Sequence, residues 1–329
     1  MTKDELYIKR CLELARQGQY YVAPNPMVGA VLADRQGVII SEGWHRRFGE
    51  AHAEVNCLSS VTADMTASAT TLYVSLEPCS HYGKTPPCAD MIARRKEELK
   101  IERVVVGTED PNPQVAGRGI RKLREAGMEV TVGVSENECR ELNRRFFCLH
   151  GKQRPYVILK WAQTADGYMG AADRRVVISN ILTKQIVHRM RAENMAIMVG
   201  TNTAVTDNPR LLNTHWSGRN PIRVLLDRKG RVPDTSRIFS PEAETIVYRD
   251  NTEWSHVLAD LAERGIHSVL VEGGATLLNH ILATGIYDEV HVEVNTELTL
   301  REGIKAPEVS LPAEPYEVIG QNKLYSYRV

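Results

Sequence analysis

Two short segments, His52-Ala53-Glu54 and Pro78 to Cys88, place three metal-binding side chains in the first half of a 329-residue chain. His52 supplies an imidazole, and Cys79 and Cys88 each supply a thiol. One nitrogen and two sulfurs suit a tetrahedral zinc ion and leave its fourth position open for water. The two segments must therefore meet in space, and this requirement constrains the fold of this half more than any other feature.

Glu54 lies two residues after His52, close enough to move protons for a zinc-bound water without being a ligand. This arrangement is typical of zinc-dependent deaminases, in which hydroxide attacks an amidine-like ring carbon and ammonia leaves. The apolar-rich run 71–76 predicts a strand that ends just before Cys79. In one respect the pattern is unusual, because eight residues separate Cys79 from Cys88 where Cys-x-x-Cys is common. Taken singly, the two thiols are equally well explained as small buried hydrophobic side chains.

The composition excludes several classes of protein. Basic and acidic side chains balance at 41 each, so we expect no basic face or stripe for nucleic acid. Six cysteines in a chain of this length do not indicate a disulfide framework. The N-terminus lacks an apolar signal core, and no apolar run approaches membrane-spanning length. We therefore expect a soluble, cytoplasmic, thiol-reduced protein with no nucleic-acid or membrane partner.

The order of the predicted elements indicates two α/β domains. Predicted strands and helices alternate from residue 28 to residue 134, and a charged helical stretch covers 139–150. The segment 151–155 is a plausible linker, after which the alternation restarts at Val157. The chain is long enough for two separate cores. We place the first domain at residues 1–150 and the second at residues 151–329.

The second half contains no Gly-x-Gly-x-x-Gly, so an ordinary Rossmann fingerprint is absent. Instead, the segment 271–277 places the pair Gly273-Gly274 between a predicted strand and a predicted helix. Glycine lets the backbone approach a ligand, and a helix N-terminus presents unpaired N–H groups to phosphate oxygens. Such pairs often only make turns, so this signal is weak alone. A second loop, 200–211, also follows a predicted strand.

The segments 24–31, 43–45, 80–87 and 110–120 closely resemble the RibD family of riboflavin-biosynthesis proteins. The long spacing between the two cysteines is expected in this family. The resemblance runs over essentially the whole chain and is more specific in the first half. It implies a cytidine-deaminase-like, three-layer α/β/α domain followed by a dihydrofolate-reductase-like α/β domain.

The resemblance also implies a bifunctional enzyme that uses Zn²⁺ and NADPH. The zinc ligands would be His52, Cys79 and Cys88, and Glu54 would be the catalytic proton shuttle. The first domain would hydrolytically deaminate 2,5-diamino-6-ribosylamino-4(3H)-pyrimidinone 5′-phosphate. The second would reduce 5-amino-6-(5-phosphoribosylamino)uracil by hydride transfer to the ribose C1′, giving the ribityl compound. We further expect a homo-oligomer.

Further binding residues are carried over from the family onto matching positions. Those for the pyrimidine substrate of the first domain are Asn25, His45, His81, Lys84, Asp110 and Asn112. Those for the sugar phosphate of the second domain are Arg191, Leu211 and Glu272. Those for the dinucleotide are Thr203, Asp207, Gly274, Ala275, Thr276, Leu277, Leu278, Asn279 and His280. Turn or capping roles are the alternative for Asn25 and Asn112, and a solvated surface position is the alternative for Arg191.

Three positions depart from the usual family pattern. Val177 stands where tryptophan is often found, Thr214 where an arginine often holds the substrate phosphate, and Arg228 where serine is frequent. Arg210 and Arg219 are candidates to supply the missing positive charge.

Two other interpretations remain open on the sequence alone. One is a nucleic-acid base deaminase with an appended binding domain, which the balanced charge and the second α/β domain disfavour. The other is a non-catalytic binding protein stabilised by metal. Glu54 argues against that interpretation, because a structural zinc site needs no adjacent carboxylate and is normally closed by four ligands.

Overall fold

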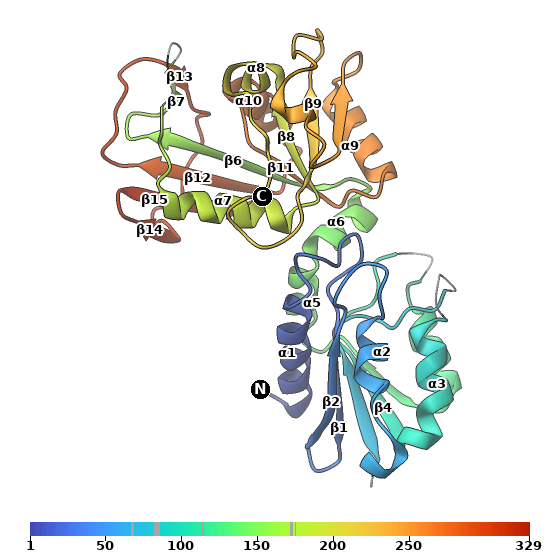
Figure 1. Ribbon diagram of the computed structural model, residues 1–329. Coiled ribbons are helices and arrows are strands. Elements are labelled where there is room, and N and C mark those ends of the chain that lie inside the picture. The colour runs from blue at the N-terminus through green and yellow to red at the C-terminus, as the bar shows by residue number, and fades with distance from the viewer. Residues whose placement is uncertain (67–68, 82–85, 113–114, 172–173, 175) are drawn as a thin grey trace. The chain divides into compact units, whose positions relative to one another are not determined.

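A computed structural model describes residues 1–66, 69–81, 86–112, 115–171, 174 and 176–329. The chain divides into two compact units, Met1–Lys152 and Gln153–Val329 (Figure 1). Within the described residues, no helix is both long enough and apolar enough to cross a membrane.

The first unit is built on a five-stranded sheet in the order β2-β1-β3-β4-β5. Its strands are β1 (Gly29–Asp34), β2 (Ile39–Trp44), β3 (Thr70–Val74), β4 (Ile101–Val106) and β5 (Glu129–Val132). β1 runs antiparallel to β2 and β3, whereas β3, β4 and β5 are parallel. The carboxyl ends of β2, β3 and β4 and the amino end of β1 therefore meet at one edge of the sheet, because Gly29 pairs with Trp44 and Ala30 pairs with Val74.

Helices cover both faces of this sheet (Figure 1). They are α1 (Lys3–Arg16), α2 (Ala53–Leu58), the 3₁₀ turn η1 (Ala63–Met65), α3 (Cys88–Leu99), α4 (Arg118–Glu125), α5 (Glu136–Leu142) and α6 (Arg144–Lys152). Side chains of β1 alternate between the faces, as a strand buried on both sides requires. Ala30 and Leu32 pack with α2 and α3, and Val31 and Ala33 pack with α1. The predicted three-layer α/β/α arrangement is confirmed.

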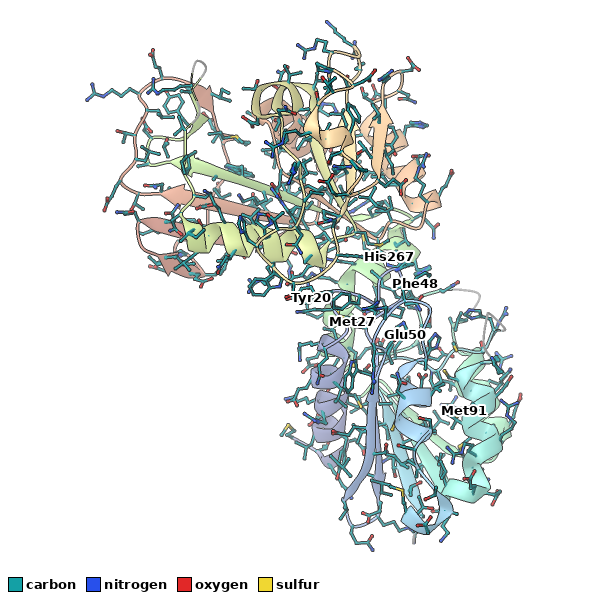
Figure 2. The ribbon with its side chains drawn as sticks, in the orientation of Figure 1. Tyr20, Met27, Phe48, Glu50, Met91 and His267 are labelled. Carbon is teal, nitrogen blue, oxygen red and sulfur yellow. The ribbon has the colours of Figure 1, made fainter. Side chains whose placement is uncertain are left out.

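The charged stretch that the sequence predicts as one helix, 139–150, is two helices that meet at Asn143. The Asn143 side chain accepts from the backbone N–H of Met27 at 2.8 Å and donates to the carbonyl of Met27 at 2.9 Å. Met27, labelled in Figure 2, precedes β1. Asn143 therefore stops the helix and fixes the chain that leads into the sheet edge, which helical periodicity alone does not reveal.

The second unit contains an eight-stranded sheet in the order β10-β9-β8-β11-β6-β12-β15-β14. Its strands are β6 (Tyr156–Thr164), β8 (Ala196–Gly200), β9 (Ile222–Leu226), β10 (Thr245–Tyr248), β11 (Ser268–Val271), β12 (Glu289–Asn295), β14 (Glu317–Ile319) and β15 (Asn322–Arg328). The first six strands in this order, β10-β9-β8-β11-β6-β12, are parallel to one another. β15 pairs antiparallel with β12, and β14 pairs antiparallel with β15. β7 (Tyr168–Gly170) and β13 (Ile304–Lys305) form a separate ladder. The two last strands of the large sheet were not predicted from the sequence.

The helices of the second unit connect the parallel strands. They are α7 (Ile181–Glu193), α8 (Thr201–Asp207), the 3₁₀ turn η2 (Arg237–Phe239), α9 (Trp254–Glu263) and α10 (Ala275–Thr284). β8 shows alternate burial again, because Ala196 and Met198 belong to one apolar cluster and Ile197 and Val199 to another. α8 directly follows β8, and α10 follows β11, its neighbour in the sheet (Figure 1). The two helices therefore begin side by side at the carboxyl edge of the parallel strands, where open α/β sheets usually bind ligands.

Candidate active sites

The three predicted zinc ligands lie together at the sheet edge of the first unit. His52 is the N-cap residue of α2, Cys79 follows β3, and Cys88 is the first residue of α3. The Nδ1 atom of His52 lies 3.6 Å from Sγ of Cys79 and 3.4 Å from Sγ of Cys88. A tetrahedral zinc bonded at about 2.3 Å to sulfur and about 2.0 Å to nitrogen needs nitrogen–sulfur separations of roughly 3.5 Å. The three side chains therefore fit zinc, and no other such triad forms in the described ranges.

The electrostatics of the Cys79 thiol also suit a metal, whereas the contact with Cys79 and burial raise the pKa of the Cys88 thiol. Contacts with the Cys88 thiol and with His52 lower the pKa of Cys79 to about 4. The backbone N–H of Cys88, at the start of α3, donates to Sγ of Cys79 at 3.3 Å. Because the thiolate is the form that binds metal ions, Cys79 is prepared for ligation at neutral pH.

Glu54 stands in the first turn of α2, immediately beyond the ligand His52. Its side chain is buried, with 3% of its surface exposed. Burial and the neighbouring Cys79 raise the pKa of Glu54 to about 7. A carboxyl group with this pKa beside a metal site is able both to accept and to release a proton near neutral pH.

Asn25 and His45 form a joined pair next to the ligands. Nδ2 of Asn25 donates to Nε2 of His45 at 3.1 Å, while Nδ1 of His45 donates to the carbonyl of Ala51 at 3.0 Å. The ring of His45 lies 5.2 Å from the ring of His52, centroid to centroid. Burial lowers the pKa of His45, so the neutral imidazole is favoured. The structure thus brings both residues to the zinc site.

Asp110 and Asn112 follow β4 at the same edge. The backbone N–H of Asn112 donates to Oδ1 of Asp110 at 2.8 Å. Burial raises the pKa of Asp110 to about 6; the charges of Glu77 and Cys79 raise it further, and that of His81 lowers it. Asp110 is thus electrostatically coupled to the predicted pocket residue His81 and to a zinc ligand. Lys84, the remaining residue of this set, lies outside the described residues.

Sequence reasoning missed Glu77, two residues before Cys79. Its side chain is 3% exposed and accepts hydrogen bonds from four backbone N–H groups of the segment 110–120. The only available signal is a glutamate at the end of an apolar strand, which does not reveal partners more than 30 residues away.

The second unit holds a cavity of about 1440 Å³ at the carboxyl edge of its parallel strands. Most of the residues expected to bind ligands line it: Arg191, Thr203, Asp207, Leu211, Glu272, Gly274, Ala275, Thr276, Leu277 and His280. Leu278 instead packs fully buried in the core, and Asn279 is exposed away from the lining. Helical periodicity explains this, because successive residues of α10 point in different directions. We therefore leave these two residues out of the proposed cofactor site.

Arg191 and Glu272 form a bidentate ion pair inside this cavity. Nε and Nη2 of Arg191 donate to the two carboxylate oxygens of Glu272 at 2.8 and 2.7 Å, and Nη1 donates to the carbonyl of Leu212 at 2.9 Å. Burial acts to raise the pKa of Glu272, but Arg191 and then Lys160 outweigh it and lower that pKa. Arg191 is thus a mostly buried, paired residue, and the alternative of a solvated surface arginine is wrong.

The cavity lining is strongly basic although the chain has no net charge. Its lining arginines are Arg174, Arg191, Arg210, Arg228, Arg231 and Arg237. Among the described lining residues, the carboxylates are only Asp207 and Glu272. Of the two arginines expected to replace the missing charge at Thr214, Arg210 lines the cavity and Arg219 does not. The backbone N–H of Thr214 itself donates to Nδ1 of His188 at 3.0 Å.

Comparisons with known protein families match both units. The model of the cytidine and deoxycytidylate deaminase zinc-binding region matches residues 1–108, and that of the RibD C-terminal domain matches residues 155–297. The riboflavin biosynthesis protein RibD of Aquifex aeolicus is 37% identical, over 94% of this chain and 91% of that protein. RibD of Escherichia coli is 34% identical, over 90% of this chain and 88% of that protein.

Solved structures agree over nearly the full length. The crystal structure of a diaminohydroxyphosphoribosylaminopyrimidine deaminase/5-amino-6-(5-phosphoribosylamino)uracil reductase from Thermotoga maritima has a TM-score of 0.86 and 37% identity, and the match covers 99% of this chain and 98% of that one. RibD of Acinetobacter baumannii has a TM-score of 0.87 and 30% identity, with 98% of each chain covered. With a zinc-binding triad in one unit and a basic ligand cavity in the other, this chain belongs to the RibD family of bifunctional deaminase–reductases of riboflavin biosynthesis.

Proposed function

We propose that residues 1–150 hydrolytically deaminate 2,5-diamino-6-ribosylamino-4(3H)-pyrimidinone 5′-phosphate. Residues 151–329 then reduce the product, 5-amino-6-(5-phosphoribosylamino)uracil, with NADPH. The observation that carries the first assignment is the meeting of three ligand atoms, all within 4.8 Å of one another, beside the buried Glu54. The two reactions are consecutive, because loss of the ring amino group gives the uracil on which the second unit acts.

In the first unit, His52, Cys79 and Cys88 would hold a zinc ion, which when bound would supply the Lewis acidity that lowers the pKa of water towards neutral. Glu54 takes the proton from the attacking water and later delivers protons to the departing amine. Asn25 and His45 are held as a neutral, hydrogen-bonded pair that is suited to reading the edge of a pyrimidine. Asp110 and Asn112 supply further polar atoms at the same edge. We assign His81 and Lys84 to the ribose phosphate.

The substitution Glu54→Gln tests this division of labour. It removes the proton shuttle while keeping the size of the side chain, so ammonia release should fall by at least about a hundredfold. Zinc content and NADPH oxidation on already deaminated substrate should be unchanged. Glu50→Gln is the matched control, since Glu50 is an exposed carboxylate four residues earlier (labelled in Figure 2). Loss of NADPH oxidation in a folded Glu54→Gln protein would contradict the proposal.

In the second unit, we propose that the dinucleotide contacts Thr203, Asp207, His280 and the start of α10 from Gly274 to Leu277. Gly274 is the N-cap of this ten-residue helix, whose first N–H groups lack intrahelical partners and suit a phosphate. Arg191, Leu211 and Glu272 would hold the sugar-phosphate substrate. The cavity volume exceeds that of an ordinary small-molecule pocket of at most about 1000 Å³, which supports two ligands bound together.

We assign the choice of NADPH over NADH to Arg228, Arg231 and Arg237, which line the cavity beyond β9. Asp227 fixes the turn that carries Arg228 and Arg231. Its carboxylate accepts hydrogen bonds from the backbone N–H groups of Arg231 and Val232, each at 3.0 Å. Nη2 of Arg231 donates to Oδ1 of Asn202 on α8 at 2.6 Å. Guanidinium groups held near the cofactor in this way favour a ligand with an additional phosphate.

We further propose that the protein is cytoplasmic, as its composition predicts, and that it acts as a homo-oligomer. Light scattering coupled to size-exclusion chromatography measures the oligomeric state directly. A monomer at micromolar concentration would contradict this part of the proposal.

A further inference from the structure

Glu77 joins two parts of the deaminase site that are far apart in the sequence. Its Oε2 accepts from the backbone N–H groups of Asp110 at 3.2 Å and Gly117 at 3.0 Å. Its Oε1 accepts from those of Gly119 at 2.9 Å and Ile120 at 3.3 Å. Four N–H groups of one segment thus converge on a single buried carboxylate.

Three of these donors belong to the start of α4. Gly117 is the N-cap of the helix, with φ of +71°, and the N–H groups of Gly119 and Ile120 belong to its first turn. N–H groups at this position have no intrahelical partner, and a negative charge there is favourable. Gly117 has no side chain with which to cap the helix, and the carboxylate of Glu77 takes that role from the end of a neighbouring strand.

The contact between α4 and the chain before Cys79 is very close. A Cβ atom on Gly119 would lie 2.1 Å from the carbonyl oxygen of Pro78 and 3.2 Å from Oε1 of Glu77. Only glycine permits this approach, so the helix start presses directly on the residues that lead to the zinc ligand. The backbone N–H of Glu77 also donates to the carbonyl of Thr108 at 2.9 Å, which ties the ends of β3 and β4 together.

We infer that Glu77 is a positioning residue of the deaminase reaction. It holds the backbone of Asp110 and the start of α4, from Gly117 to Ile120, against the chain that leads to Cys79. The link to the substrate runs from Glu77 to the backbone of Asp110, and from Oδ1 of Asp110 to the backbone of Asn112. This inference rests on the proposed role of Asp110 and Asn112 in substrate binding.

The test substitution is Glu77→Gln. Glutamine keeps the shape of the side chain but replaces one carboxylate oxygen with an NH₂ group. The backbone N–H groups that donate to that oxygen would then face another donor and lose their hydrogen bonds. Loss of such a hydrogen bond to a buried group should raise the KM for the pyrimidine substrate by about tenfold. The kcat should change much less, the zinc content should stay at that of the unsubstituted chain, and NADPH oxidation should be unaffected. An unchanged KM, with or without a lower kcat, overturns the inference.

Glu109→Gln is the matched control, because Glu109 is an exposed carboxylate next to Asp110 and its substitution removes the same charge from the same region. It should leave the KM unchanged. If Glu77→Gln does not fold, Glu77→Asp decides the question, since it keeps the charge but withdraws the oxygens by one methylene. It should raise the KM by a smaller factor, and an unchanged KM for this variant overturns the inference.

Asp110→Asn, measured in parallel, separates this inference from the proposed function. A raised KM for Asp110→Asn together with an unchanged KM for Glu77→Gln overturns the positioning role alone. An unchanged KM for both substitutions overturns the substrate role of Asp110 and the positioning role together.

Discussion

The two units prepare for their ligands in different ways. The zinc site of the first unit consists of three side chains whose ligand atoms lie within 4.8 Å of one another, at the starts of two helices and the end of one strand. The cavity of the second unit is large and is lined by side chains and backbone from many elements, with a surplus of arginines. One site depends on a few fixed distances, and the other depends on shape and electrostatic field.

This difference decides how each site responds to substitution. A metal site loses its chemistry when one ligand or the proton shuttle changes, because no neighbour can replace it. A basic cavity distributes its binding energy, so removal of one exposed arginine weakens binding only moderately. The exception in the second unit is the Arg191–Glu272 pair, which is mostly buried and, like the zinc site, depends on the geometry of particular side chains.

The largest effect in the second unit is therefore expected for Glu272→Gln. It leaves the guanidinium of Arg191 buried without its counter-charge, which costs about 3 kcal/mol of unfolding free energy. NADPH oxidation should be lost, while ammonia release should be retained because the substitution lies outside the first unit. Denaturant unfolding and the two activity assays check this. Glu263→Gln, on the exposed face of α9, is the control. Equal loss of both activities would contradict the conclusion that each unit carries its own reaction.

A smaller effect is expected from His188, which lines the cavity beside Arg191. Burial, followed by the charges of Arg191 and His215, lowers the pKa of His188 to about 4. The unfolded chain, with a histidine pKa of about 6.5, therefore takes up this proton first. This contribution to the free energy of unfolding is present above about pH 6.5 and is lost as the pH falls towards about 4. Linkage with these two pKa values gives a loss of at most about 2 kcal/mol between pH 7 and pH 5, and solvent in the open cavity reduces it.

Urea unfolding of the second unit at these two pH values, with and without His188→Asn, measures this contribution. The difference between the two pH values should be smaller in the variant. If the variant shows the same pH dependence as the unsubstituted chain, His188 does not contribute, and the cavity is less protected from solvent than we infer.

The smallest effect is expected for Arg228→Ser, which restores the residue frequent in the family. Arg228 is exposed at the cavity lining, so its removal should weaken NADPH binding by about fivefold and leave NADH binding unchanged. Fluorescence titration with each dinucleotide measures both constants without turnover. Lys229→Ser removes the same charge from the adjacent position, which does not line the cavity, and should have no effect. An equal loss for both dinucleotides would place Arg228 outside the 2′-phosphate site.

The sequence predicted the features in which chemistry dictates residue type. Zinc requires particular donor atoms, so His52, Cys79 and Cys88 were identifiable from residue type together with the adjacent Glu54. The long spacing between the two cysteines was explained only by the family resemblance. The main strands and helices were also predicted, because a core buried on both faces of a sheet leaves a clear apolar pattern. For other site residues, such as Asn25 and Arg191, only the family resemblance pointed to a role.

The features that the sequence did not predict all depend on partners distant along the chain. Glu77 binds backbone N–H groups, and any residue type except proline provides such a group. Asn143 interrupts a helix because of Met27, 116 residues earlier. β15 (Asn322–Arg328) begins with asparagine and lysine, has a serine between two tyrosines and ends with arginine, and it is ordered by pairing with β12.

The bond between Asn143 and Met27 has a consequence for synthesis on the ribosome. All three zinc ligands have left the exit tunnel well before Asn143 does, so a nascent chain is able to collect metal early. The segment that carries Asn25 gains its contact with Asn143, through Met27, only when the end of α5 emerges and docks. A stalled fragment that ends before residue 143 should therefore bind zinc but lack a complete pyrimidine pocket.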